Sequence, residues 1–194
     1  MIPLPSDRPV LVAIAGPNGA GKSTFYEAFL APAGLRFVNA DRIALELGLE
    51  AYAAAEVAAR IREELVARGE SSVFETVFSD PAGAKVEDLV RWRSSHTVVL
   101  CFVGLDDVEL SDTRVAMRVS QGGHDVPTEK LVDRFPRILA NLARTLDALA
   151  LVQLFDNSDL ASPFRLVAIF RNGRLERTST TACRWLDEVE SLRR

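Results

Sequence analysis

Apolar residues along the chain follow two different spacings, which alternate from the N-terminus onward. Residues 10–15 and 97–103 form nearly continuous apolar runs, which are typical of strands covered on both faces of a sheet. Residues 54–65 instead place apolar side chains three or four positions apart, with charged residues between them, as in an amphipathic helix. Strands that alternate with helices in this way require parallel pairing with right-handed crossovers. The pattern therefore predicts an α/β fold.

The same reading places the remaining elements along the chain. Asp80 followed by Pro81 is a typical N-cap and first helical residue, so a helix is expected to begin there. Asn172 and Gly173 separate two strand-like segments and predict a type I′ hairpin, which adds an antiparallel edge to the sheet. Further strands are expected at residues 35–39, 72–78 and 151–155, and further helices at residues 22–30, 111–119 and 182–192 and after residue 128.

Composition and charge narrow the class of protein. The 194 residues include 48% hydrophobic and 26% charged residues, an ordinary balance for a globular protein, and are expected to form one domain spanning residues 1–194. The formal net charge of -4 gives no electrostatic reason to expect nucleic acid or a membrane as a partner. Cys101 and Cys183 lack metal-ligand spacing and are interpreted as reduced, buried thiols. The apolar segment near the N-terminus is too short to span a bilayer, so a cytoplasmic location is expected.

The first apolar strand leads into a glycine-rich phosphate-binding motif. Gly16, Gly21, Lys22 and Ser23 have the P-loop spacing, and they lie between a predicted strand and a predicted helix, which is the context this motif needs. Glycines let the backbone wrap a phosphate and direct N–H groups at it. Lys22 is expected to neutralise the β- and γ-phosphates of ATP, and the Ser23 hydroxyl to be a Mg²⁺ ligand. The expected ATP-binding residues are Gly16, Pro17, Asn18, Gly19, Ala20, Gly21, Lys22, Ser23 and Thr24.

Charged residues that follow other strands are predicted to meet the P-loop. Asp41 and Glu75 come near the carboxyl ends of two predicted strands, where open α/β sheets bind ligands. Arg114 and Arg118, four residues apart on one predicted helix, leave the sheet at the same edge. We favour Asp41 as a catalytic group over the alternative that it only caps the following helix. Of the two arginines, Arg118 is the better candidate for a functional role.

Several short motifs occur in a fixed order along the chain: Gly16 to Thr24, Asn39-Ala40-Asp41, Phe74-Glu75-Thr76, Arg118, Gly122-Gly123-His124-Asp125-Val126-Pro127 and Arg134. Taken together, these motifs resemble the zeta-toxin-like family of P-loop kinases. The resemblance implies a three-layer fold of the nucleotide-kinase type, with a parallel sheet in the order 2-3-1-4-5. Zeta toxins transfer the γ-phosphate of ATP, with Mg²⁺, to a sugar hydroxyl of UDP-N-acetylglucosamine, and an antitoxin protein restrains them.

The resemblance also implies roles for individual residues. Asp41 matches the carboxylate that accepts the proton of the attacking hydroxyl, while Glu75 and Thr76 fall where the family builds its acceptor pocket. Arg118 and Arg134 match arginines that hold the transferring phosphate, so Asp41, Lys22, Arg118 and Arg134 form the expected catalytic set. The implied function is an ATP-dependent kinase of a nucleotide-linked sugar, with an antitoxin as partner.

Two alternatives stay open. The loop at residues 121–127 differs from that of the best-known toxins, so another hydroxylated metabolite is an alternative acceptor. A nucleotide-binding ATPase or regulatory module without kinase activity is an alternative of a different class, suggested only by the string Ser120-Gln121-Gly122-Gly123.

Overall fold

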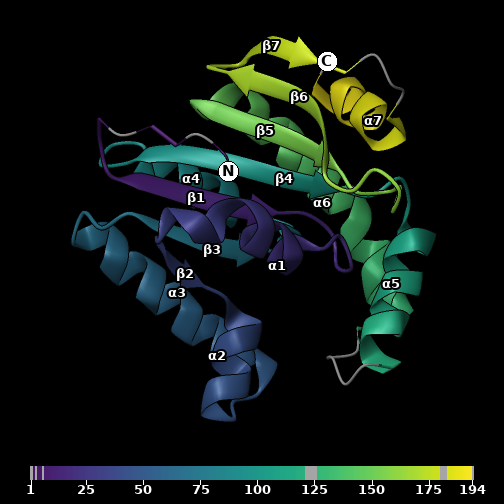
Figure 1. The fold of residues 1–194 in the computed structure, drawn as a ribbon, viewed down its shortest axis with the longest axis horizontal. Helices are drawn as coiled ribbons and strands as arrows, with labels where there is room; N and C mark the ends of the chain where they lie inside the picture. The colour runs from purple at the N-terminus through teal and green to yellow at the C-terminus, as the bar shows by residue number, and fades with distance from the viewer. Residues whose placement is uncertain (1, 3, 6, 121–125, 180–182, 194) are drawn as a thin grey trace.

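A single mixed sheet organises the molecule (Figure 1). The computed structural model describes residues 2, 4–5, 7–120, 126–179 and 183–193. The strand order is β2-β3-β1-β4-β5-β6-β7. The first five strands in this order pair in parallel with their neighbours, whereas β6 pairs antiparallel with both β5 and β7. The expected order of 2-3-1-4-5 with a C-terminal antiparallel hairpin is confirmed. The strands are β1 (Val10–Ala15), β2 (Arg36–Val38), β3 (Ser72–Thr76), β4 (Thr97–Gly104), β5 (Leu151–Asp156), β6 (Arg165–Arg171) and β7 (Arg174–Thr178).

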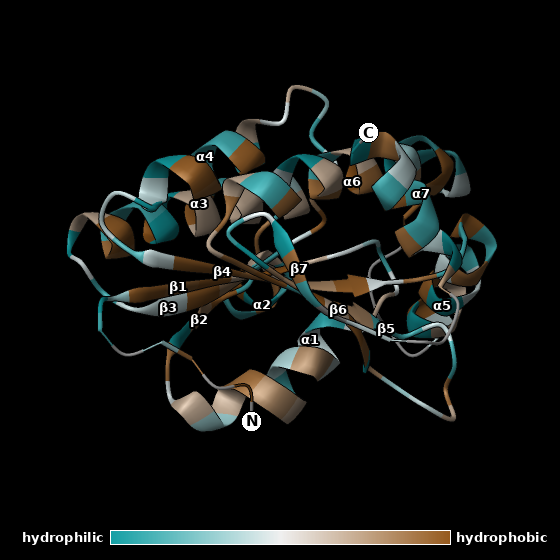
Figure 2. Ribbon diagram, turned by 90° about the horizontal axis from the view of Figure 1, so that it is seen from above, coloured by the Kyte–Doolittle hydropathy of each residue, from teal (hydrophilic) through white to brown (hydrophobic). Residues whose placement is uncertain are grey.

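Helices cover both faces of this sheet (Figure 2). The elements α3, α4, α6 and α7 lie on one face, and α1 with the segments that follow it lies on the other. β1 serves both layers, because Leu11, Ala13 and Ala15 belong to one core cluster while Val12 and Ile14 belong to the other. The helices are α1 (Lys22–Phe25), the π-helical η1 (Tyr26–Leu30), the 3-10 helix η2 (Ala31–Ala33), α2 (Ala40–Leu47), α3 (Ala51–Ala67), α4 (Ala84–Trp92), α5 (Val108–Ser120), α6 (Thr128–Ala148) and α7 (Arg184–Arg193).

The C-terminal hairpin forms as the sequence predicts. Asn172 and Gly173 both adopt positive φ, at 48° and 78°, which is the signature of a type I′ turn. The two flanking strands pair antiparallel and extend the sheet beyond β5. β5 therefore has a hydrogen-bonded neighbour on each side and is not an edge strand of the sheet.

The helix after β3 begins later than expected. α4 starts at Ala84, with Gly83 as its N-cap at φ 77°, so Asp80 and Pro81 do not begin it. Long-range contacts explain the delay: Asn141 of α6 donates from Nδ2 to the backbone oxygens of both Phe78 and Asp80, at 3.0 Å each. These bonds hold the segment in a turn, and the helix begins only after it.

Both cysteines are free and buried, as predicted. Burial raises the pKa of the Cys101 and Cys183 thiols to about 12. Among the described residues, none of the helices combines the length and the apolar character that crossing a bilayer requires.

Candidate active site

The loop between β1 and α1 has a conformation that only glycine fits. Gly16 has φ 148°, and a Cβ at this position would lie 2.1 Å from the backbone oxygen of Val103. Gly21 has φ 84°, and a Cβ there would lie 2.9 Å from Nδ2 of Asn157. A larger residue would therefore be strained in its backbone and would collide with its neighbours. The loop is a tightly packed cradle, and the helix expected at residues 22–30 follows it as α1 and η1.

Two buried side chains hold this loop from outside. Ser111 of α5 donates from Oγ to the backbone oxygen of Asn18 at 2.7 Å. Asn157, which follows β5, donates from Nδ2 to the backbone oxygen of Ala20 at 2.9 Å and accepts at Oδ1 from the N–H of Phe164 at 3.2 Å. These contacts occupy loop carbonyl oxygens and so fix the conformation of the loop. The sequence analysis missed both residues, since neither belongs to a motif.

Lys22 is buried beneath the loop, with 6% of its surface exposed. Its Nζ donates to the backbone oxygens of Gly16 at 3.1 Å and Pro17 at 2.9 Å, and lies 3.8 Å from Glu75 Oε1. Burial lowers the pKa of Lys22, and the carboxylates of Glu75 and Asp41 oppose that shift. The ammonium is thus held against the loop, and the carboxylates of Glu75 and Asp41 favour its charged form.

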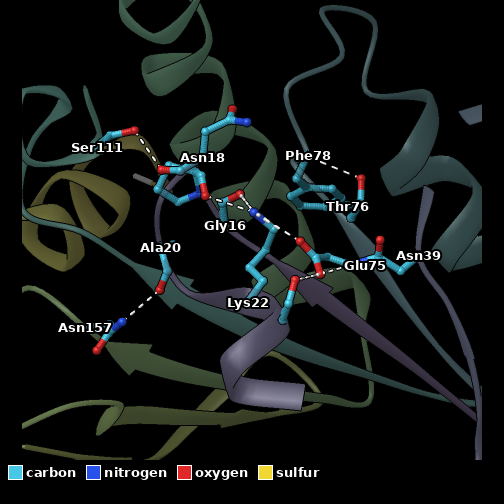
Figure 3. A network of polar contacts seen from close by, with 12 residues as sticks. Gly16, Asn18, Ala20, Lys22, Asn39, Glu75, Thr76, Phe78, Ser111 and Asn157 are labelled. Carbon is cyan, nitrogen blue, oxygen red and sulfur yellow. Dashed lines mark hydrogen bonds and ion pairs between the residues drawn. The ribbon is translucent and has the colours of Figure 1, made fainter. Parts of the chain in front are cut away.

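Glu75 links the loop to the neighbouring strands (Figure 3). Its Oε2 accepts from Ser23 Oγ at 2.8 Å and from Asn39 Nδ2 at 2.7 Å. The contact follows from the sheet order, because β3 lies beside β1 and Glu75 is in register with Ile14. Glu75 therefore touches the predicted metal ligand Ser23, in addition to facing the cleft where it was expected to meet an acceptor.

Asp41 lies in the first turn of α2 and faces the same cleft. The N-cap of α2 is Asn39, whose Oδ1 accepts from the N–H of Arg42 at 2.9 Å. The alternative that Asp41 merely caps the helix is therefore wrong. The guanidinium of Arg42 lies 5.0 Å from the ring centroid of Phe37 in β2 and pairs with Glu27, which anchors the start of α2. Asp41 is exposed and makes no hydrogen bond to another described residue.

The cleft in front of the P-loop has a volume of about 600 Å³. Predicted site residues on its wall are Asn18, Gly19, Gly21, Lys22, Ser23, Thr24, Asp41, Glu75, Thr76 and Arg118, and Arg114 joins them. Arg134 of α6 is not on this wall, but it lies near enough to Lys85 to help lower the pKa of that lysine. Arg62 of α3 and Lys85 of α4 do line the cleft, and the sequence analysis missed them. Residues 121–125, most of the loop that the resemblance invoked, lie outside the described residues.

Solved structures with the same fold come from proteins of distant sequence. The complex of AvrRxo1-ORF1 and -ORF2 with ATP matches with a TM-score of 0.66 and 17% identity; the match covers 96% of this chain, which spans only 64% of the matched chain. The PezAT chromosomal toxin–antitoxin system of Streptococcus pneumoniae matches with a TM-score of 0.55 and 16% identity, covering 96% of this chain and 78% of that one. A gluconokinase from Sinorhizobium meliloti 1021 matches with a TM-score of 0.52 and 18% identity, covering 80% and 87%.

The chain has a P-loop kinase fold. No protein-family model and no curated protein sequence matches it. At identities this low the likeness concerns the fold, and the chemistry must be argued from the residues of this chain.

The residues that line the cleft fit a nucleoside triphosphate and Mg²⁺. The glycine cradle is too tight for any side chain and opens to the cleft, as a phosphate site requires. Lys22 supplies a buried positive charge, and the hydroxyl of Ser23 with the carboxylates of Glu75 and Asp41 are oxygen donors of the kind that Mg²⁺ prefers. The site can therefore hold a polyphosphate at the P-loop, in the same cleft that the carboxylate of Asp41 faces.

Proposed function

We propose that this protein is a kinase that transfers the γ-phosphate of ATP to a hydroxyl group of a small molecule. One observation carries the proposal: the P-loop residues Lys22 and Ser23 and the carboxylate of Asp41, which is not a helix cap, face a single cleft. A P-loop alone is compatible with hydrolysis, whereas a carboxylate across the same cleft supplies the base that a hydroxyl acceptor needs.

The P-loop and Glu75 would bind the phosphates of ATP and Mg²⁺. Lys22 would exchange its contacts with the Gly16 and Pro17 oxygens for oxygens of the β- and γ-phosphates. Ser23 would hold Mg²⁺, and Glu75 orients the Ser23 hydroxyl through their hydrogen bond. Bound Mg²⁺ neutralises charge on the phosphate oxygens.

Asp41 would activate the acceptor hydroxyl, and Arg118 and Arg134 would stabilise the transferring phosphate. Asp41 would accept the proton of the acceptor hydroxyl as its oxygen forms a bond to the γ-phosphorus and the bond from that phosphorus to ADP breaks. Arg118 would stabilise the charge that spreads over the transferring group, a role in which an arginine is worth roughly 10³ to 10⁵ in rate. Arg134 is the second arginine of the proposal; it does not line the cleft, but it lies near enough to Lys85 to lower the pKa of that lysine.

A paired assay tests the proposal. Purified protein is incubated with ATP and Mg²⁺, with and without a panel of acceptors that includes UDP-N-acetylglucosamine, gluconate, sugar phosphates and neutral polyols, and products are identified by mass spectrometry. A phosphorylated acceptor is the expected product, and its loss in Asp41→Asn ties it to this cleft. Release of ADP at the same rate with and without every acceptor would favour the ATPase alternative.

A partner protein that restrains the enzyme belongs to the same proposal. Leu45, Leu47 and Tyr52 expose 86%, 62% and 79% of their surface on α2 and the start of α3, and Tyr52 also lines the cleft. Exposed apolar side chains on neighbouring helices are a suitable contact for a regulator. Induced expression of the wild type beside Asp41→Asn should slow growth only for the wild type; equal growth would count against a toxic kinase.

A further inference from the structure

Two cationic side chains line the cleft without any role in holding the nucleotide. Arg62 comes from α3 and Lys85 from α4, and both face the cleft beside Thr76 at the end of β3. The Arg62 guanidinium lies 5.0 Å from the ring centroid of Phe74. Neither side chain makes a hydrogen bond or a close ion pair with any described residue, and the Nε of Arg62 is fully buried. The buried Nε of Arg62 therefore lacks a hydrogen-bond partner among the described residues, and a bound group with an acceptor oxygen would supply one.

The carboxylates nearest to Arg62 are already engaged elsewhere. Glu63 and Asp88 both influence Arg62, yet each is hydrogen-bonded to Arg91, at 2.8 and 2.7 Å. Burial lowers the pKa of Arg62, as expected for a guanidinium whose charge is incompletely matched.

Lys85 lies among charged residues of both signs. Burial lowers the pKa of Lys85; Arg62, Arg134 and Lys22 lower it further, and Asp80 opposes the shift. Neither carboxylate oxygen of Asp80 makes a hydrogen bond within the described part of the chain. The charges that act on Lys85 are therefore mostly positive.

The balance of charge over the whole cleft points the same way. Its wall carries the cations Lys22, Arg62, Lys85, Arg114 and Arg118 against the acids Asp41, Glu56 and Glu75, although the protein as a whole has a net charge of -4. Lys22 and Arg118 are assigned to the phosphates of ATP, and Arg114 donates to the backbone oxygen of Ser158. Arg62 and Lys85 are the two cations of the cleft wall that have no such assignment. A small cavity behind them, about 10 Å³ and lined by Phe74, Phe78 and Trp92, has room for at most one water molecule, so a ligand would reach them from the cleft.

We propose that Arg62 and Lys85 form an anion site for the acceptor, so that the molecule phosphorylated by this enzyme carries a carboxylate or a phosphate besides its reacting hydroxyl. This inference rests on the proposed function, since it takes the Asp41 end of the cleft as the acceptor site. A guanidinium presents paired donors to a planar or tetrahedral anion, and a nearby ammonium adds a point charge. Hydroxy acids and phosphorylated sugars are the acceptor classes that fit, and neutral polyols are excluded.

Anion binding without turnover tests this inference. Protein saturated with ADP and Mg²⁺ is titrated by calorimetry with inorganic phosphate and, separately, with D-glycerate as a carboxylate probe. Saturable binding of at least one probe is expected, and Arg62→Gln or Lys85→Met should weaken it by about tenfold or more, the loss of one charged hydrogen bond. The probe that binds more tightly identifies phosphate or carboxylate as the recognised group. No saturable binding of either probe would overturn the inference.

Matched variants separate this site from its surroundings. Arg60→Gln on the exposed side of α3 and Lys130→Met on α6 remove the same charges outside the cleft and should leave the affinity within about twofold, the range expected for exposed charges. Because Lys85→Met leaves Asp80 without its cation, the double variant Asp80→Asn with Lys85→Met is measured as well, and thermal unfolding checks that each variant folds. Binding that survives in Arg62→Gln and Lys85→Met but is lost in Arg118→Gln would place the probe at the transferring phosphate and overturn the inference.

The two proposals fail in different ways. If ATP is not transferred to any acceptor while the anion titration behaves as expected, the proposed kinase activity falls and the anion site stands as a binding site. If an uncharged polyol is phosphorylated as efficiently as its carboxylate or phosphate analogue, the kinase stands and the anion site falls.

Discussion

The two ends of the cleft are built in different ways. At the nucleotide end, one continuous segment forms the cradle from its own backbone, and the buried side chains of Ser111 and Asn157 hold its carbonyl oxygens. At the other end, Asp41, Arg62 and Lys85 come from three separate helices and meet only because α2, α3 and α4 surround the end of β3. The nucleotide end is a backbone cradle with the buried ammonium of Lys22 and the carboxylate of Glu75 beside it, whereas the acceptor end is a set of charged side chains without hydrogen bonds or ion pairs between them.

This difference has a functional consequence. Contacts made by backbone groups suit a ligand that is always the same, such as a polyphosphate, because they leave little room for variation. Side chains from separate helices can be exchanged without disturbing the sheet, so they suit the acceptor, which differs from one kinase to another. Substitutions at the nucleotide end should therefore affect every reaction of ATP, and substitutions at the acceptor end only those that involve an acceptor.

Lys22→Ala should have the largest combined effect, because it is expected to impair both phosphoryl transfer and ATP binding. Removing the buried cation at the phosphates is expected to slow transfer by roughly 10³-fold and to weaken ATP binding by about 10- to 100-fold, the worth of a charged hydrogen bond. Steady-state rates and calorimetric ATP affinity measure the two parts. Unchanged turnover at saturating ATP would remove Lys22 from the nucleotide end.

Asp41→Asn tests the acceptor end by itself. Loss of the base should lower kcat for acceptor phosphorylation by roughly 10²- to 10⁴-fold, while ATP affinity stays nearly unchanged because the phosphates are held by other groups. Acceptor-free hydrolysis of ATP should be partly spared, since the water that attacks in place of the acceptor hydroxyl can release its proton to bulk solvent.

Arg118→Ala is the matched comparison for Asp41→Asn. It removes charge from the transferring group and should slow acceptor phosphorylation and acceptor-free hydrolysis together. If instead Asp41→Asn weakens ATP binding by more than about tenfold, roughly 1.4 kcal/mol, the carboxylate organises the nucleotide end and the contrast between the two ends disappears.

The same contrast explains what the sequence could predict. The P-loop is a contiguous motif between a strand and a helix, so Gly16 to Thr24 and the strand β1 could be recognised from neighbouring residues alone. Asp41 and Glu75 could be found because parallel strands bring their carboxyl ends to one edge. In each case the signal lies close to the end of a strand.

What the sequence could not predict depends on contacts between distant segments. Asn141 holds the turn at Phe78 and Asp80 from more than 60 positions away, and so moves the start of α4 to Ala84. Arg62 and Lys85 occupy positions that are indistinguishable from the solvated face of an amphipathic helix. Only the packing of α3 and α4 around Phe74 turns them toward the cleft.

Ser23→Ala should have a smaller effect at the nucleotide end. The loss of one oxygen ligand is expected to move the Mg²⁺ dependence of the reaction to higher concentration while leaving the maximal rate at saturating Mg²⁺ less affected. Glu75→Gln keeps the size of its side chain and can still accept from Ser23, so it should shift the metal titration less than Ser23→Ala does. Coincident metal titrations for the wild type and Ser23→Ala would argue against Ser23 as a ligand.

Asn157→Ala should have the smallest effect, and it asks whether the cradle depends on being held from outside. The substitution removes the donor to the Ala20 oxygen and the acceptor for the Phe164 N–H, both buried, so a loss of about 1–3 kcal/mol in the free energy of unfolding is expected. For a domain of this size that corresponds to a fall in Tm of about 2–4 °C per kcal/mol. ATP affinity should fall as well, because the loop must then be ordered when the nucleotide binds, whereas the ratio of acceptor phosphorylation to acceptor-free hydrolysis should stay constant. Ser162→Ala, on the exposed part of the same loop, is the control and should change neither quantity. A lower Tm with unchanged ATP affinity would show that Asn157 serves the fold alone, and a changed ratio would mean that the two ends of the cleft are coupled through β5.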